Sequence, residues 1–329
     1  MPLTLIPTRS ENEALPMFSE DLVQRLSQGD LQALCELDAR GVFCGDDEDA
    51  QTLAERIRAL QENQRKFNLT LQEQGQAELE DLSVRQQDQI PPELFEQPAQ
   101  ITERLFRFNI DWTSGFFVDP AGGLFFGGCA YYFFPDFFVL FIIRRSFKDK
   151  PGWLFYQRDE LLAHELCHVS RVALKSQVYE EILAYQTATT AFRRFFGGIF
   201  RRPADSFAFI GLAVLLFAAQ LGRAIFLPAL PAWPAWLPLL LFCAWLLRRH
   251  LGDMRRLRQA GKNLTAYFPA DSVQALLFRC TDREILALAE LDRRENLLTW
   301  LQNRQQSSLR WRVIMARFNP EKHHCDPTS

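Results

Sequence analysis

The sequence predicts a mainly helical α+β fold, with a small antiparallel sheet next to one central helix and a transmembrane helical hairpin. Three observations carry this prediction. Helix start signals and apolar periodicity recur in the first hundred residues and after Pro269. An aromatic stretch from Phe106 to Phe147 is interrupted by glycine and proline, which is typical of strands and tight turns. A long run from Ser206 to Leu247 contains Arg223 as its only charge.

The first predicted region, residues 1–105, is polar, rich in glutamine and glutamate, and helical. Helices are expected to start at Ser19 and Asp30, because these side chains can accept the free N–H groups of a first turn. A longer helix is expected over residues 47–84 and another over residues 92–108. The region is expected to pack as a helical hairpin or to serve as a partner-binding arm, and a regulatory pro-segment stays open.

The second predicted region, residues 106–200, begins with the aromatic stretch. Strands are expected near 115–118, 123–134 and 137–147. A rival interpretation makes 124–143 a membrane segment, because it has twenty residues and a single charge. Its glycines and proline favour strands, and the aromatic surface of such strands is compatible with a membrane interface.

The motif His164-Glu165-Leu166-Cys167-His168 follows, within a helix expected over residues 157–173. Positions four apart lie on one helix face, so both imidazoles can point at one ion. Two neutral imidazoles and a carboxylate are typical of a catalytic zinc site that keeps its fourth position open. Glu165 would then act as general base toward a zinc-activated water. The motif therefore predicts a zinc-dependent hydrolase with Zn²⁺ as its cofactor.

The third ligand is expected from a second helix over residues 179–188, at Glu181 or Glu180. With its HExxH motif followed by Glu181-Ile182-Leu183-Ala184-Tyr185, the sequence resembles the gluzincin metallopeptidases over about residues 137–188. In that family a glutamate on a following helix, in the setting E-x-x-A-D or E-x-x-x-D, is the third ligand. The resemblance implies a zinc metallopeptidase that hydrolyses peptide bonds, with His164, His168 and Glu181 as ligands.

The resemblance departs from the family pattern at Tyr185, which stands where the pattern has an aspartate. The carboxylate that orients a zinc histidine is therefore expected from Glu180 or Asp159. An oxyanion stabiliser is also required, and the candidates are Tyr179, Tyr185 and Arg171. An edge strand before the HExxH helix would suit a peptidase, because a substrate chain can pair with it through backbone hydrogen bonds.

The third predicted region, residues 201–250, is a transmembrane hairpin with spans at about 206–227 and 229–248. Its prolines and tryptophans are expected at the far interface, and a re-entrant second half stays open. Positive charge flanks the hairpin, and no lysine or arginine lies between its spans. The positive-inside rule then predicts a multi-pass protein of an inner or cytoplasmic membrane, with both termini and the zinc site on the cytoplasmic side. The flanking arginines are Arg193, Arg194, Arg201, Arg202, Arg248, Arg249, Arg255, Arg256 and Arg258.

The last predicted region, residues 251–329, is a cytoplasmic helical domain with a capping box at Thr281 and Glu284. The net charge of −3 argues against a nucleic-acid surface, so the expected partners are membrane lipid and a peptide or protein substrate. Seven scattered cysteines are consistent with a reducing compartment. Two alternatives stay open: a membrane-tethered interaction protein with a structural or vestigial zinc site, and a zinc hydrolase of non-peptide amides.

Overall fold

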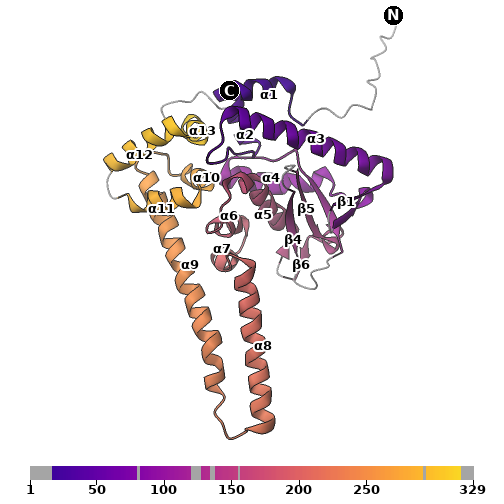
Figure 1. Ribbon diagram of the computed structural model, residues 1–329, viewed down its shortest axis with the longest axis vertical. Coiled ribbons are helices and arrows are strands. Elements are labelled where there is room, and N and C mark those ends of the chain that lie inside the picture. The colour runs from indigo at the N-terminus through magenta and orange to yellow at the C-terminus, as the bar shows by residue number, and fades with distance from the viewer. Residues whose placement is uncertain are drawn as a thin grey trace, which may run out of the picture.

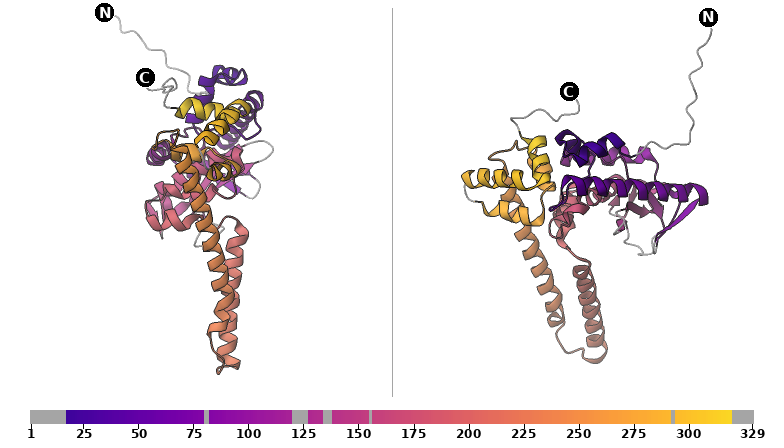
Figure 2. Two further views of the ribbon diagram at one scale, coloured as in Figure 1. Left: turned by 90° about the vertical axis from the view of Figure 1, so that its left-hand side faces the viewer. Right: turned by 45° about the horizontal axis from the view of Figure 1, so that its top comes forward.

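The computed structural model shows a body of packed helices and small sheets from which two long helices project. These are α8 (Pro203–Phe226) and α9 (Leu237–Leu264), which leave the body on the same side (Figures 1 and 2). The described segments confirm a mainly helical chain with small sheets. The structure describes residues 17–79, 82–119, 127–133, 138–154, 156–291 and 294–319.

The first two helices, α1 (Glu20–Ser27) and α2 (Leu31–Ala39), start where the sequence predicts. The side chains of Ser19 and Asp30 each accept a backbone N–H of the first turn, at 3.1 and 3.0 Å. These bonds satisfy donors that have no partner within the helix, and such caps typically contribute about 1 kcal/mol each.

The third helix, α3 (Ala50–Gln74), is shorter than the predicted helix over 47–84. It ends at Gly75, which adopts a left-handed φ of 71° that glycine tolerates best. The chain then forms a hairpin of β1 (Gln76–Leu79) and β2 (Leu82–Arg85). Buried and exposed side chains alternate in both strands, and this period of two replaces the helical period. The helix prediction was therefore wrong after residue 74.

The predicted helix over 92–108 is a 3₁₀ turn, η2 (Pro92–Phe95), followed by α4 (Glu96–Phe106). Arg107 ends α4 in a left-handed conformation with φ of 58°. Helix α4 packs directly against the helix that carries the HExxH motif. The last helix of the N-terminal region therefore supports the helix that carries the motif.

The main sheet contains β3 (Ser114–Val118), β4 (Gly128–Phe133) and β5 (Phe138–Arg144), in the order β3-β5-β4. Strand β5 is antiparallel to β4 but parallel to β3. The prediction of an antiparallel sheet was therefore wrong for β3. The chain reverses direction twice between β3 and β5, so these two strands point the same way.

Both faces of the central strand β5 are covered by protein. Leu140 and Ile142 pack with side chains of α3, β1 and β2, while Phe141 and Ile143 join the main core on the other face. The rival interpretation of 124–143 as a membrane segment is therefore wrong for its described residues. The parts of 123–134 and 137–147 at 123–126, 134 and 137 lie outside the described residues.

A short hairpin of β6 (Gly152–Trp153) and β7 (Tyr156–Gln157) leads into α5 (Arg158–Arg171), the predicted HExxH helix. The next helix, α6 (Glu180–Ala184), continues as a 3₁₀ turn, η5 (Tyr185–Thr187), over the predicted range. A short helix, α7 (Ala191–Phe196), then leads toward α8.

The C-terminal helices close the body, and the predicted capping box forms. The Thr281 hydroxyl accepts the N–H of Glu284, and the Glu284 carboxylate accepts the N–H of Thr281. One buried apolar cluster joins side chains of the N-terminal helices, α5 and this segment, with the rings of Phe106 and Phe278 stacked at 3.9 Å. The helices are α10 (Val273–Phe278), α11 (Asp282–Glu290), α12 (Arg294–Ser307) and α13 (Leu309–Phe318).

The two predicted spans differ in the structure. Helix α8 is long and apolar enough to cross a membrane, and it is the one described helix for which this holds. Residues 229–236 form a loop and a 3₁₀ turn, η7 (Trp233–Trp236), so a continuous helical span over 229–248 was wrong for that half. Its prolines lack the N–H that a helix interior needs. Helix α9 begins at Leu237 and becomes charged from Arg248 onward.

Candidate metal centre

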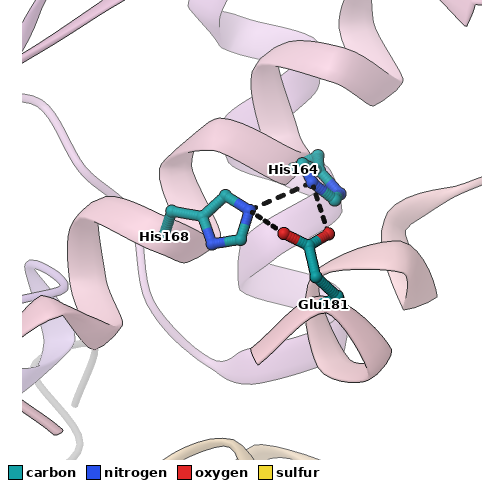
Figure 3. Close-up of side chains that lie close together, drawn as sticks. All are labelled: His164, His168 and Glu181. Carbon is teal, nitrogen blue, oxygen red and sulfur yellow. Dashed lines mark hydrogen bonds and ion pairs between the residues drawn. The ribbon is translucent and has the colours of Figure 1, made fainter. Parts of the chain in front are cut away.

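The predicted ligands come together at the start of α6. His164 and His168 lie one turn apart on α5, and their Nε2 atoms are 3.1 Å apart. Glu181 lies opposite, with Oε2 3.5 Å from His164 Nε2 and Oε1 3.5 Å from His168 Nε2 (Figure 3). The helical spacing of the motif therefore produces the common face that the sequence predicts.

The geometry and chemistry of the three side chains fit zinc. One donor atom from each residue lies within 4.8 Å of the other two. In a tetrahedral site with bonds of about 2.0–2.2 Å, neighbouring ligand atoms are about 3.3–3.6 Å apart. The two imidazole nitrogens are 3.1 Å apart, and each lies 3.5 Å from a different oxygen of Glu181, close to this range. Two imidazoles and a carboxylate are also a typical ligand set of a catalytic zinc site.

The neighbouring Glu180 contacts the far side of one histidine. Its Oε1 lies 3.0 Å from His168 Nδ1, and its Oε2 accepts a hydrogen bond from Arg171 Nε at 2.8 Å. The Nδ1–H of His168 donates to this carboxylate, so Nε2, which points toward Glu181, is the nitrogen that a metal ion would take in place of a proton. Asp159, the other carboxylate expected in this role, pairs instead with Arg158 at 3.4 Å.

Only one of the three expected oxyanion stabilisers lines the site. The Arg171 side chain is fully buried, where it donates to Glu180 and to the carbonyl of Phe278. Tyr179 is fully buried in the main core. Tyr185 does reach the site, with its ring 4.5 Å from that of His164. Burial raises the pKa of the Tyr185 hydroxyl, which therefore keeps its proton and can donate a hydrogen bond.

The turn that presents Glu180 and Glu181 is held by a residue more than 100 positions away. Asp282, the first residue of α11, accepts the hydroxyl of Ser176 at 2.5 Å. It also accepts the backbone N–H groups of residues 177, 178 and 179, at 2.7, 2.9 and 3.3 Å. Burial raises the pKa of Asp282, but these hydrogen bonds outweigh it and lower the pKa. The ionised carboxylate thus fixes the position of α6 relative to α5.

The three side chains open into a cleft of about 460 Å³. One wall is the backbone of β4, which among the described strands pairs only with β5 and leaves its other edge toward the cleft. Tyr156 and Arg193 also line the cleft, and the sequence did not predict either of them. No sequence signal separated Arg193 from the arginines expected to flank a membrane. The lining residues are Gly127, Gly128, Cys129, Ala130, Tyr156, Leu161, His164, Glu165, His168, Glu181, Tyr185 and Arg193.

Glu165 lies within the cleft wall with only 4 % of its surface exposed. Burial raises the pKa of its carboxyl group, while the two histidines and a hydrogen bond from the Ala130 backbone oppose this shift. A carboxyl group with a raised pKa takes up and releases a proton closer to neutral pH, as a general base requires. Glu165 therefore has the environment expected of its predicted role.

The ligands carry opposite pKa shifts. Burial raises the pKa of Glu181, but the hydrogen bond with His164 and the charge of His168 outweigh it and hold the pKa at about 2. Burial lowers the pKa of His168, but the hydrogen bond to Glu180 and the nearby carboxylates raise it to about 10. The metal-free site therefore holds a proton on His168 between carboxylates, a place suited to a cation.

Comparison of the chain with protein-family models, with curated proteins and with solved structures finds no match. The likeness to gluzincins is carried by the motif residues and their setting, over about residues 137–188.

Proposed function

We propose that the protein is a membrane-anchored zinc metallopeptidase, with His164, His168 and Glu181 as zinc ligands and Glu165 as general base. The observation that carries this proposal is the meeting of two imidazole nitrogens and a carboxylate within 4.8 Å. A buried glutamate stands next to them, and all four residues line one cleft. A structural zinc site has no need for such a base, so the tethered interaction protein ranks second.

The chemistry would divide between the metal and the chain. Zinc, when bound, would polarise a water molecule and the scissile carbonyl. The Glu165 carboxylate takes the proton of the attacking water and later gives it to the leaving amine nitrogen. Glu180 keeps His168 in the tautomer that offers Nε2, and Arg171 in turn orients Glu180. The Tyr185 hydroxyl, held protonated by burial, donates to the developing oxyanion.

The substrate would bind as an extended chain along β4. The free edge of β4 faces the cleft, and a peptide that adds to this edge gains backbone hydrogen bonds in a fixed register. Gly128 lets β4 lie close to β5, because a Cβ at this position would be 2.9 Å from the carbonyl oxygen of Ile142. This arrangement favours peptide bonds over other amides.

Helix α8 would be the membrane anchor. Its 24 residues extend about 36 Å, which exceeds the roughly 30 Å of a hydrocarbon core. None of its residues is buried in the protein. Arg249 of α9 pairs with Asp205 at the start of α8 at 2.6 Å, so the chain returns to the level at which it entered. The loop, η7 and the apolar start of α9 would form the returning limb, and by the positive-inside rule the arginine-rich flanks favour a body on the cytoplasmic side.

Metal content and hydrolysis, measured on the same detergent-purified variants, test this proposal. Wild type should carry about one zinc per chain and cleave a mixed-sequence peptide library, and both His164→Ala and Glu181→Ala should lose the metal. Glu165→Gln should keep zinc but lose at least about 100-fold in rate. Glu73→Gln, an exposed change on α3, is the control that should alter neither property.

Each departure has a distinct meaning. Retained hydrolysis in Glu165→Gln would refute the general-base role, and retained zinc in Glu181→Ala would move the third ligand elsewhere. Zinc without hydrolysis in the wild type would favour the membrane-tethered interaction protein.

A further inference from the structure

Exposed apolar side chains that the described body does not cover lie next to cleft-lining residues in the chain. We propose that the mouth of the cleft lies in the membrane–water interface, and that the substrates are extended peptide segments held at the bilayer surface. A segment next to the membrane anchor of another protein, or a lipid-bound peptide, would meet this requirement. The inference rests on the proposed membrane-anchored peptidase and specifies its substrate class.

Large exposed apolar side chains occur close in the chain to the cleft-lining residues. Outside α8, α9 and their connection, the described residues include five of them, and three lie within three positions of a lining residue: Phe192 at 69 %, Leu154 at 53 % and Phe196 at 37 % exposure. Phe192 directly precedes the cleft-lining Arg193, and Leu154 lies two residues before the cleft-lining Tyr156. Scattered exposed apolar residues need no explanation, but a group around one opening indicates an interaction surface.

Hydrogen bonds fix the height of α7 relative to the anchor. Nε2 of His250 on α9 lies 2.6 Å from the carbonyl oxygen of Phe195, in the last turn of α7. His250 is three residues, or about 4.5 Å along the axis, beyond Leu247, where the uncharged part of α9 ends. The headgroup layer on each side of a bilayer is about 5–7 Å thick. Helix α7 therefore lies at the level of the headgroups.

The junction between body and anchor is rigid at this level. Arg249 donates to the carbonyl of Ile199 at 3.1 Å and pairs with Asp205 at the start of α8. Only six residues separate the end of α7 at Phe196 from the start of α8 at Pro203. The two exposed phenylalanines of α7, whose rings are 4.8 Å apart, cannot move far from the membrane surface.

The same helix forms one wall of the cleft. Arg193 of α7 pairs with the buried Glu160 of α5, and its guanidinium lies 5.3 Å from the ring centre of Tyr156. Helix α7 and strand β6 both lie on the side of the body from which α8 and α9 project (Figure 1). A peptide on the membrane surface therefore reaches the cleft directly, while the exposed aromatic rings contact the interface, which aromatic side chains favour.

Fluorescence quenching in vesicles tests the position of the mouth. The full chain, with Phe192→Cys or Leu154→Cys labelled with a polarity-sensitive dye, is reconstituted into phosphatidylethanolamine–phosphatidylglycerol vesicles that contain brominated lipid. The labelled unsubstituted chain corrects for the native cysteines. Leu69→Cys, at an exposed apolar position of α3, is the matched control, and Leu215→Cys in α8 reports on the anchor itself.

The expected result is quenching at 192, 154 and 215, and none at 69. Quenching at 215 alone would overturn the interfacial mouth while leaving the anchor intact. Absence of quenching at 215 would refute the membrane anchor and, with it, this inference.

A second measurement tests the substrate class. Vesicle-bound enzyme is given a mixed-sequence peptide library with and without a palmitoyl chain. We expect the lipid-bound peptides to be cleaved at least about tenfold faster, because the chain concentrates them at the surface. The double substitution Phe192→Ser and Phe196→Ser should lower this ratio, whereas Leu69→Ser should not. Equal rates on both libraries would overturn the substrate class, and no zinc-dependent cleavage of either would refute the proposed peptidase as well.

Discussion

The Glu180 carboxylate accepts a hydrogen bond from His168 and another from Arg171, so Glu180→Gln is a sharp perturbation of the site. In the carboxylate, one oxygen accepts His168 Nδ1–H at 3.0 Å and the other accepts Arg171 Nε–H at 2.8 Å. The amide of glutamine has only one acceptor oxygen, so it satisfies one donor and turns its own N–H₂ toward the other. The substitution keeps the shape of the side chain and removes one charge.

The magnitude follows from the burial of Arg171. Its side chain is fully buried, so the loss of its carboxylate partner leaves a buried charge whose ion pair among the described residues is gone and which keeps its hydrogen bond to the Phe278 carbonyl. Breaking a buried pair in this way costs about 3–5 kcal/mol of unfolding free energy. Loss of the carboxylate that orients a ligating histidine lowers metal affinity about 10–100-fold.

Zinc affinity, from competition with a chromophoric chelator, and urea unfolding of the metal-free protein in detergent measure the two effects. The matched control is Asp88→Asn. Asp88 is a buried carboxylate that accepts two hydrogen bonds from Arg145, at 2.6 and 2.8 Å, and neither residue lines the cleft. The control should lose stability but keep zinc affinity. Wild-type zinc affinity in Glu180→Gln would refute the orienting role of Glu180.

Four further predictions concern the turn before α6, the proton on His168 and the membrane anchor. Asp282→Ala removes four hydrogen bonds from the turn before α6, so the zinc affinity in the chelator titration should fall about 10–100-fold. A wild-type affinity would show that the turn keeps its position without Asp282. Because His168 of the metal-free site has a pKa of about 10, zinc binding at pH 8 should release about one proton, measurable by calorimetry in buffers of different ionisation enthalpy. The raised pKa also means that His168⁺ stabilises the metal-free fold at low pH, and this contribution is lost as the pH rises through about 10; a flat unfolding free energy between pH 8 and 11 would contradict it. Leu215→Arg places a charge in the middle of α8 and should disfavour insertion by about 2.5–3.5 kcal/mol, seen as loss from carbonate-washed membranes, while Leu69→Arg should have no such effect.

Features that depend on neighbouring residues followed from the sequence. The caps at Ser19 and Asp30 and the box at Thr281 were predictable because a side chain and an N–H two or three positions away are held together by the helix itself. The shared face of His164 and His168 follows from the helical period alone.

The position of the third ligand depended on tertiary structure. Glu180 and Glu181 are neighbours, and a rotation of about 100° separates them on a helix. Which of them reaches the Nε2 atoms of both histidines depends on how α6 is held, and Asp282 of α11 and Arg171 of α5 hold it. No local pattern contains a contact that spans more than 100 residues.

The sheet order and the cleft walls depended on long-range contacts in the same way. Strand β3 lies beside β5 and not beside its sequence neighbour β4. Arg193, which the sequence predicts only as a charge next to a membrane, forms an ion pair with Glu160. The sequence by itself determined the helix caps, the shared face of the motif and the long apolar run of α8, because each depends on residues within a few turns. Only the tertiary structure decided that Glu181 meets the two histidines, that β4 pairs with β5 alone among the described strands, and which residues line the cleft, because these depend on which distant surfaces pack together.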